Sequence, residues 1–339
     1  MNKICHILIL LFFLGCSTDS SSEDILTDGN GGNTGGGFTG GGGGGGNIED
    51  LNVELITTYD DQTASFSAPF GNFVRNFIVH VPPNYNSATQ SLPLVFVLHG
   101  YTSQAPIIRQ YSGFDQISDE ENFIAVYVQG TTDIFGNTGW NAGRFGAFTA
   151  VDDVGLFRSL INYFKSNYNI DTSKIFSTGM SMGGFMSYRL ACEVDDINSI
   201  GSVTGSMGGY TACQPQTKKS IIHFHGEEDT VVPYNGGDWL YSANEAHEFW
   251  KNYNECSDQA SITLPDFNGD SQYTKKLVSY NCGEDTTVEL YSLEGEGHTW
   301  FSQNWGHDVS SSELIWQFFK NQQKKKKIIF LIYQSQIVF

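Results

Sequence analysis

Short apolar segments recur along the chain from about residue 51 onward, separated by polar stretches. They are rich in branched and aromatic side chains, and each is bounded by Gly or Pro. Several are apolar at almost every position instead of alternating, which is typical of strands buried on both faces of a parallel sheet. We therefore predict strands within residues 72–83, 92–100, 121–130, 173–179, 197–205, 219–226 and 286–295.

Helical patterns lie between these segments. One helix face is formed by Val154, Phe157, Leu160, Ile161 and Phe164. Residues 238–253 and 311–321 have the spacing of later helices. Because alternating strands and helices are typical of an α/β fold, we expect one such domain over residues 51–320. Its central sheet should be mostly parallel, with helices on both faces.

The N-terminus has the features of a targeting signal. Lys3 precedes an apolar run over residues 7–14, which is too short to span a bilayer as a mature helix. The run ends in FLGCS, which resembles the lipobox of bacterial lipoprotein signal peptides. We expect a signal peptide over residues 1–15 and a lipid on Cys16, so that the protein is exported. It would then be anchored to a bacterial membrane, with the outer membrane favoured, or lie outside the cell. A plain secretory signal cut nearby is the alternative.

The segments that flank the domain differ from it in composition. Residues 16–50 are rich in Gly and Ser with almost no apolar side chains, which predicts a flexible tether. Residues 321–339 form a Lys-rich and then apolar tail, too short for a transmembrane span. The sequence does not explain the role of this tail.

The composition narrows the possible partners. The chain has 339 residues, of which 40% are hydrophobic, enough to bury a full core. Its net charge of −19 would repel phosphate backbones and anionic membrane surfaces. We therefore expect no nucleic-acid partner, and membrane contact through the lipid anchor alone. The sequence leaves the oligomeric state open.

A serine between two glycines lies directly after a predicted strand. Gly179, Ser181 and Gly183 form the pattern G-x-S-x-G, at a corner where the strand gives way to a helix-forming stretch. A nucleophile at such a corner needs a strained backbone with positive φ, and its neighbours two residues away must have almost no side chain. Ser181 is therefore our candidate nucleophile. The stretch around Ser206 lacks the first glycine, so we interpret Ser206 as an ordinary turn residue.

A serine nucleophile needs a base, and His298 is the histidine placed to supply it. It lies on a Gly-rich loop after the last predicted strand. His80, His223 and His225 sit within apolar strands and His247 sits on a helix, where packing is the expected role.

The acid that orients this base is expected at Asp229. It follows the predicted strand 219–226 and directly precedes a turn, TVVP. The resulting order of nucleophile, acid and histidine along the chain is that of α/β-hydrolases. Asp152 or Asp153 is a rival acid, but both precede the serine, and N-capping of the following helix explains them more simply.

Six segments together carry a family resemblance. They are LHGYTS (98–103), VQGTTDIFGNTGWNAG (128–143), VDDVG (151–155), STGMSMGG (177–184), HFHGEEDTVVPYNGG (223–237) and GEGHTW (295–300). In this set the chain resembles the secreted polyhydroxybutyrate depolymerase and feruloyl esterase group of α/β-hydrolases, over roughly residues 53–319. The resemblance implies the α/β-hydrolase fold, with Ser181 as nucleophile, Asp229 as acid and His298 as base.

The resemblance also implies an oxyanion hole made of backbone amides. Here these would be the amide of Met182, directly after the nucleophile, and that of Tyr101 or Thr102 in the loop after His99.

Three further residues are candidates for contact with substrate. Trp140 and Asn141 match the GWN segment, which the resemblance places near the substrate cleft. A buried aromatic residue with a turn asparagine is the alternative. Trp300 follows the loop of His298, and we expect it to contact substrate as well.

Together these features predict an exported serine carboxylic-ester hydrolase that acts through an acyl-enzyme and needs no cofactor. No CxxC or HExxH motif is present, and His298 with His307 and Asp308 is too weak a grouping for a metal site. We favour feruloyl or acetyl esters of plant polysaccharide as substrates, because tryptophans near the cleft would suit a flat acyl group or a sugar. The alternatives are a polyhydroxybutyrate depolymerase, or a non-catalytic surface lipoprotein that binds glycan or polymer.

Four cysteines remain once those of the signal peptide and the lipid anchor are set aside. An even number in an exported chain predicts disulfides, and three pairings are possible. Pairing Cys192 with Cys213 and Cys256 with Cys282 would close two local loops, and the family resemblance points the same way. We therefore predict these two disulfides.

Overall fold

The structure, a computed structural model, describes residues 50–83, 85–143, 148, 150–208 and 213–322. The predicted signal peptide, its lipidation site Cys16, nearly all of the predicted tether, and the tail beyond residue 322 lie outside the described residues. Within the described ranges, no helix is both long and apolar enough to cross a membrane.

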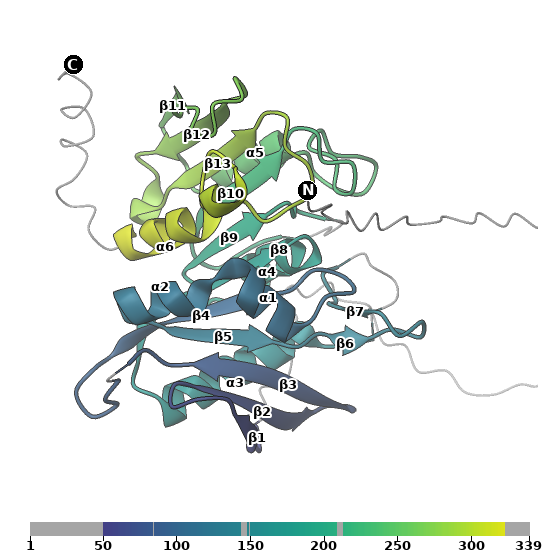
Figure 1. Cartoon of the computed structure of the whole chain (residues 1–339), viewed down its shortest axis with the longest axis vertical. Helices are drawn as coiled ribbons and strands as arrows, with labels where there is room; N and C mark the ends of the chain where they lie inside the picture. Colours follow the sequence, from purple (N-terminus) through teal and green to yellow (C-terminus); the bar gives the residue numbers. More distant parts are fainter. Residues whose placement is uncertain (1–49, 84, 144–147, 149, 209–212, 323–339) are drawn as a thin grey trace, which may run out of the picture. The chain divides into compact units, whose positions relative to one another are not determined.

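One large sheet runs through the described fold (Figure 1). Its strands are β1 (Glu54–Thr58), β2 (Thr63–Phe70), β3 (Phe73–His80), β4 (Leu92–Leu98), β5 (Ile124–Val128), β8 (Ile170–Met180), β9 (Ser199–Val203), β10 (Ser220–Gly226), β11 (Asp258–Thr263), β12 (Thr274–Tyr280) and β13 (Val288–Leu293). They lie side by side in the order β1-β2-β3-β5-β4-β8-β9-β10-β13-β12-β11. The centre of the sheet, from β5 to β13, is parallel. Antiparallel strands extend it at both edges.

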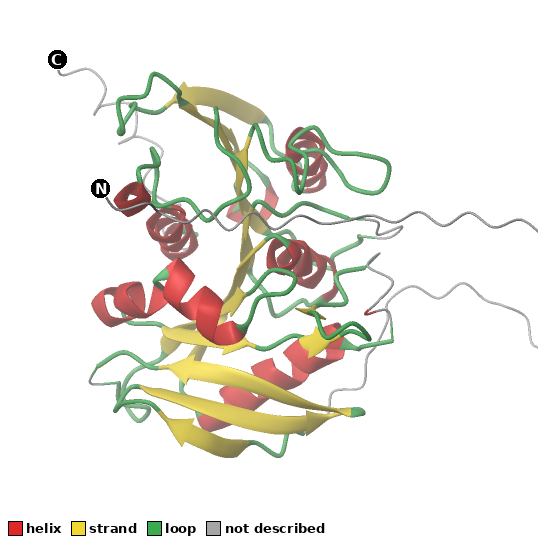
Figure 2. Ribbon diagram, turned by 45° about the vertical axis from the view of Figure 1, so that its right-hand side comes forward, coloured by secondary structure: helices red, strands yellow, loops and turns green. Residues whose placement is uncertain are grey.

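Helices cover both faces of this sheet (Figure 2). The helices are α1 (Ala105–Ser112), α2 (Phe114–Glu121), α3 (Asp153–Asn167), α4 (Met182–Glu193), α5 (Ala243–Tyr253) and α6 (Ser311–Asn321), with short 3₁₀ turns η2 (Gly283–Asp285) and η3 (Gln303–Trp305). The apolar side chains of α3, α4 and α5 belong to one core, and those of α1, α2 and α6 to the other. A small antiparallel hairpin, β6 (Thr131–Thr132) with β7 (Thr138–Gly139), stands apart from the large sheet.

Strand β4 shows how the pattern of side chains creates two cores. Leu94, Phe96 and Leu98 belong to the core under α3 and α4, whereas Val95 and Val97 belong to the core under α1 and α6. Successive side chains of a strand point to opposite faces, so a strand that is apolar at every position contributes to both cores.

The predicted α/β-hydrolase fold, with a parallel centre and helices on both faces, is confirmed, and the sequence pattern missed the edges. The edge strand β1 has five exposed residues, and the edge strand β11 alternates between half-buried and exposed residues. Such strands lack the continuous apolar run that identified the central ones.

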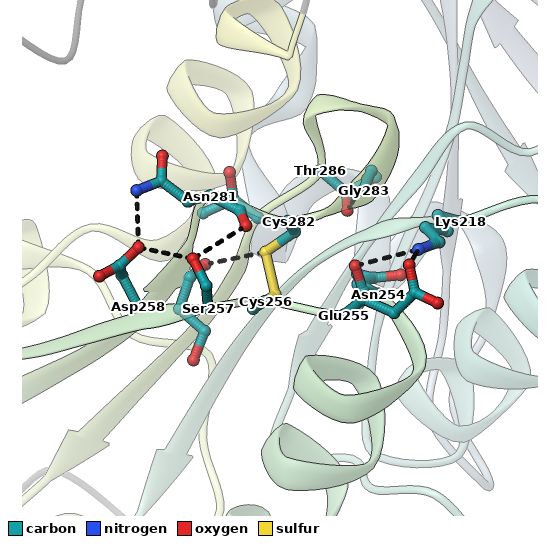
Figure 3. Close-up of a disulfide and its surroundings, with 12 residues drawn as sticks. Lys218, Asn254, Glu255, Cys256, Ser257, Asp258, Asn281, Cys282, Gly283 and Thr286 are labelled. Carbon is teal, nitrogen blue, oxygen red and sulfur yellow. Dashed lines mark hydrogen bonds and ion pairs between the residues drawn. A yellow bond between two sulfur atoms is a disulfide. The ribbon is translucent and has the colours of Figure 1, made fainter.

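Both predicted disulfides are present. Cys192 is bonded to Cys213, at the C-terminal end of α4. Cys256 is bonded to Cys282 and joins the chain after α5 to the segment after β12 (Figure 3). The two bridges close loops with sequence separations of 21 and 26 residues, so each restricts the unfolded chain locally.

Burial lowers the pKa of three histidines in this fold. The pKa values of His99 and His247 fall to about 4 from an ordinary 6.5, with burial as the largest cause. The pKa of His223 falls well below 6.5, first through burial and then through the charges of His225 and His247. The cores therefore hold these three imidazoles in their neutral form at pH 7.

We predict that the protein loses stability as the pH falls from 6.5 toward 4. In the unfolded chain these histidines bind a proton near pH 6.5, whereas in the fold they stay neutral down to about pH 4 or below. The unfolded state thus binds more protons in this window, so the free energy of unfolding falls by up to about 3 kcal/mol for each of His99 and His247, and His223 contributes in the same direction.

Urea unfolding between pH 7 and pH 4 measures this loss. The variant His247→Gln retains a side chain able to bond Ser279 Oγ, which His247 Nε2 contacts at 2.9 Å, but it cannot titrate. Its stability should therefore fall less steeply than that of the unmodified protein. Equal slopes for the two proteins would show that His247 is not held neutral.

Candidate active site

The topology brings the three predicted catalytic residues to the C-terminal ends of parallel strands of the sheet. Ser181 directly follows β8, Asp229 comes shortly after β10, and His298 comes shortly after β13. These strands belong to the parallel run β8-β9-β10-β13, so their C-terminal ends lie at the same edge. In open α/β sheets this edge is the usual place for a ligand.

Ser181 occupies a strained corner between β8 and α4. Its backbone has φ 54° and ψ −121°, a conformation that costs a non-glycine residue free energy and that is characteristic of a nucleophile elbow. The two glycines of the motif are required by close packing. A Cβ on Gly179 would lie 2.5 Å from the carbonyl carbon of Gly183, and a Cβ on Gly183 would overlap the carbonyl oxygen of Leu98.

Asp229 and His298 are hydrogen-bonded to each other. His298 Nδ1 lies 2.7 Å from Asp229 Oδ2, and the other carboxylate oxygen accepts the backbone N–H groups of Val231 and Val232 at 2.8 and 2.9 Å. Asp229 is buried, while the ring of His298 is partly exposed. The carboxylate accepts the proton on Nδ1, which leaves Nε2 as the basic nitrogen of the ring.

The pKa of Asp229 lies below its ordinary value. Burial by itself would raise the pKa, but hydrogen bonds from His225 and His298, the charge of His298 and the Val232 amide outweigh it. The group is therefore a carboxylate at neutral pH and can stabilise a positive charge on His298.

The rival acids have structural roles. Asp152 caps α3, accepting the N–H of Gly155 at 2.8 Å. Asp153 is fully buried and pairs with Arg75 at 2.7 Å. Within the described ranges, no group of three or more His, Cys, Asp or Glu side chains is arranged to hold a metal ion.

The loop after β4 passes against the nucleophile. A Cβ on Gly100 would lie 3.3 Å from the Cβ of Ser181. Met182 is the first residue of α4, where backbone N–H groups have no partner inside the helix, and the Tyr101 amide makes no hydrogen bond within the described residues. Thr102, in contrast, donates its amide to the Thr138 carbonyl at 2.8 Å, which removes it as an oxyanion donor and leaves Tyr101.

Trp140 and Asn141 are buried, which corrects the expectation that they contact substrate. Trp140 is 0% exposed, and its Nε1 donates to the His99 carbonyl at 2.8 Å. The backbone N–H of Asn141 donates to Asp153 Oδ2 at 2.6 Å, and its side-chain amide donates to the Val151 carbonyl at 2.7 Å. The structure thus has the alternative arrangement, a buried aromatic residue with a turn asparagine. The hydrogen bond of Trp140 holds the loop after β4, which we call the oxyanion loop because it carries the candidate donor Tyr101.

Trp300 is buried as well, which corrects the third expected substrate contact. It is 1% exposed, and its Nε1 donates to Ser312 Oγ of α6 at 2.8 Å. It borders a cavity of about 280 Å³ between α1, α2 and α6, which none of the three catalytic candidates lines.

The sequence analysis missed an exposed apolar pair beside the site. At the tip of the β6–β7 hairpin, Ile134 and Phe135 are 90% and 78% exposed. Asp133 holds this tip, because its Oδ1 accepts the amides of Phe135 and Asn137 at 2.8 Å each and its Oδ2 accepts the Tyr101 hydroxyl at 2.9 Å. The only sequence signal was the turn-forming stretch DIFGN, which reveals a turn but not its neighbour.

Comparisons with known proteins identify esterases and a depolymerase as relatives. The Dienelactone hydrolase family model matches residues 146–253. The bifunctional acetylxylan esterase/xylanase XynS20E of Neocallimastix patriciarum is 26% identical, over 71% of this chain and 32% of that protein. A probable feruloyl esterase C of Aspergillus flavus is 30% identical, over 62% of this chain and 76% of that protein. Poly(3-hydroxyalkanoate) depolymerase C of Paucimonas lemoignei is 27% identical, over 70% and 61%.

Among solved structures, acetyl xylan esterase from Aspergillus awamori aligns with a TM-score of 0.47 and 16% identity, covering 79% of this chain and 99% of that one. The chain spans only 32% of the length of XynS20E, a protein with two activities in its name. The match to feruloyl esterase C has a higher identity than the match to XynS20E and covers more of the relative. The chain therefore belongs to the α/β-hydrolase esterase group that includes the feruloyl esterases.

Proposed function

We propose that this protein is an exported serine carboxylic-ester hydrolase that works through an acyl-enzyme. One observation carries the proposal: a serine in a strained corner shares a sheet edge with a histidine that is hydrogen-bonded to a buried carboxylate. A protein that only binds ligand has no use for a strained serine, since the strain lowers stability without adding a contact.

The acylation step uses each of these groups. Ser181 Oγ attacks the ester carbonyl carbon while His298 Nε2 takes its proton. Asp229 fixes the tautomer of His298 and stabilises the imidazolium that forms. The amides of Met182 and Tyr101 donate to the oxyanion of the tetrahedral intermediate. His298 then protonates the leaving alcohol, and the acyl group stays on Ser181.

Deacylation repeats the chemistry with water. His298 takes a proton from a water molecule, which attacks the acyl-enzyme, and the carboxylic acid leaves as Ser181 recovers its proton. Besides the ester and water, neither half of this reaction needs a group outside the chain.

Export is part of the proposal. The predicted lipoprotein-type signal and Cys16 support it, as do the two disulfides, because structural disulfides persist mainly in proteins outside the reducing cytoplasm. The lipid on Cys16 would tether the enzyme to a bacterial membrane.

For the substrate, we propose feruloyl or acetyl esters of plant polysaccharide. The relatives include an acetylxylan esterase/xylanase and a feruloyl esterase, which supports this class. The substrate contacts that the sequence suggested for Trp140 and Trp300 do not support this substrate class, because both side chains are buried.

A second candidate is a polyester such as polyhydroxybutyrate, and one observation favours it. Ile134 and Phe135 project into solvent beside the oxyanion loop, where an apolar solid could adsorb. A depolymerase among the relatives points the same way.

Ser181→Ala and His298→Ala should each lower kcat/KM on a short p-nitrophenyl ester by at least about 10³-fold, because the nucleophile and the base act as one unit. Ser206→Ala is the matched control, since Ser206 Oγ only donates to the Tyr241 carbonyl. A fluorophosphonate should label the unmodified protein at Ser181 and leave Ser181→Ala unlabelled. If Ser181→Ala kept substantial activity, the assignment of the nucleophile would be wrong.

Trp140→Phe should lower kcat by about 10-fold with little change in KM, because the oxyanion loop loses the indole N–H that holds the His99 carbonyl. Trp250→Phe serves as control: Trp250 is equally buried, but its Nε1 has no hydrogen-bond partner among the described residues. Trp140→Phe should lose more thermal stability than Trp250→Phe, because only Trp140 loses a hydrogen bond, and only Trp140→Phe should have a lower kcat. Equal kcat values would contradict the bracing role of Trp140.

The substrate class is tested by one panel with the full-length protein: methyl ferulate, acetylated xylan, hydroxybutyrate oligomers and a polyhydroxybutyrate suspension. We expect release of ferulate or acetate. Replacing both Ile134 and Phe135 by Ser should leave p-nitrophenyl ester hydrolysis unchanged and weaken only turnover of a solid. Clearing of the suspension without release of ferulate or acetate would replace the first substrate class by the second.

A further inference from the structure

Two histidines lie side by side in the strand that leads to Asp229. His223 and His225 are two residues apart on β10, so their side chains point to the same face of the sheet. They are 2% and 0% exposed. Buried polar rings in a central strand lower stability unless each nitrogen has a hydrogen-bond partner.

The partners form a continuous file that ends at the catalytic carboxylate. The hydroxyl of Tyr188, on α4, lies 3.0 Å from His223 Nδ1, and His223 Nε2 lies 3.0 Å from His225 Nδ1. His225 Nε2 then lies 2.8 Å from the Val232 carbonyl and 3.5 Å from Asp229 Oδ2.

If the His225 ring is neutral, its last acceptor fixes the direction of every bond in the file. A carbonyl oxygen can only accept, so His225 must carry its proton on Nε2. In a neutral ring His225 Nδ1 then accepts, which requires His223 to carry its proton on Nε2. His223 Nδ1 accepts in turn from the hydroxyl of Tyr188, whose pKa is raised by burial, so that this hydroxyl keeps its proton.

We propose that Tyr188, His223 and His225 form a positioning file for the catalytic acid, which holds Asp229 from behind in the orientation that His298 needs. The proposal rests on the proposed esterase function, since it assigns these residues a role in that reaction. None of the three bonds to Ser181 or His298 in the structure, so they are positioning residues.

Val232 connects the file to the carboxylate of Asp229. Its N–H donates to Asp229 Oδ1 at 2.9 Å, while its carbonyl accepts from His225 at 2.8 Å. One peptide segment therefore links the file to the carboxylate. Oδ1 is fixed by two backbone amides, and Oδ2 faces His298 at 2.7 Å with the His225 N–H at its edge. Rotation of the carboxylate would break several bonds together.

The tautomers provide a test that does not depend on activity. In the full-length protein labelled with ¹⁵N-histidine, His223 and His225 should both be neutral with the proton on Nε2 at pH 7. Difference spectra of His223→Gln and His225→Gln assign the two rings. A proton on Nδ1 of either ring, or a charged ring, would overturn the proposed direction of the file.

Kinetics test the role in catalysis. His225→Leu removes both bonds of the ring and should lower kcat on a p-nitrophenyl ester by about 10-fold with KM nearly unchanged, because Val232, whose N–H holds Asp229 Oδ1, then loses the partner of its carbonyl. His225→Gln should restore most of this loss, since its amide N–H and carbonyl can replace Nε2 and Nδ1. Tyr188→Phe should have a smaller effect in the same direction.

The control is His247→Gln, a buried histidine outside the file whose Nε2 bonds to Ser279 Oγ. It should keep the kcat of the unmodified protein, and thermal unfolding of each variant separates lost folding from lost rate. If folded His225→Leu kept full kcat, or if His225→Gln were no better than His225→Leu, the positioning role would be wrong. An unmodified protein that hydrolyses no ester would overturn the esterase function instead, and the tautomer measurement would still decide the file.

Discussion

The candidate active site depends on the close contact between the start of α4 and the end of β4. Gly183 touches the carbonyl oxygen of Leu98, and no side chain larger than hydrogen would fit there. This contact brings the helix near enough for Ser181 to turn out of the sheet and for the Met182 amide to face the same space as the loop after β4. A single Cβ at position 183 would push α4 away from the loop after β4, and Ser181 with it, although Gly183 has no side chain to take part in any chemistry.

Around this contact, burial and hydrogen bonding hold polar groups that would otherwise destabilise the cores. Trp140 braces the His99 carbonyl, Asp153 holds the turn at Asn141, and Arg75 balances the charge of Asp153. All of these side chains are buried. The loops of the candidate site are therefore held in place by buried polar side chains and their hydrogen bonds.

Most of the sheet, and the gathering of Ser181, Asp229 and His298 at the C-terminal ends of its parallel strands, could be predicted from the sequence, because both depend on local patterns. Continuous apolar runs identify central strands, and the motif around Ser181 encodes a steric demand. Side-chain direction was not predictable in the same way. The GWN and GEGHTW segments do lie near the site, but nothing in the sequence shows that the indoles of Trp140 and Trp300 turn inward. Thr102 could be excluded only once its amide was seen bonded to Thr138. His225 carried a signal in its spacing from His223, and its own partners His223, Asp229 and Val232 are near it in the sequence. The sequence does not show that both rings point to the hydroxyl of Tyr188 on one side and to the Asp229 loop on the other.

In the β6–β7 hairpin, the residues that fix the shape of the turn are different from the two that are exposed at its tip. Asp133 fixes the shape of the turn by accepting two backbone amides, together with Gly136, whose φ is 83°. The side chains of Ile134 and Phe135 are exposed and do not hold the turn. Mutations at these two positions could accumulate in a lineage without disturbing the Tyr101 contact or the chemistry behind it. The outer surface of the hairpin and the loop that carries Tyr101 are therefore independent of each other, although a single aspartate connects them.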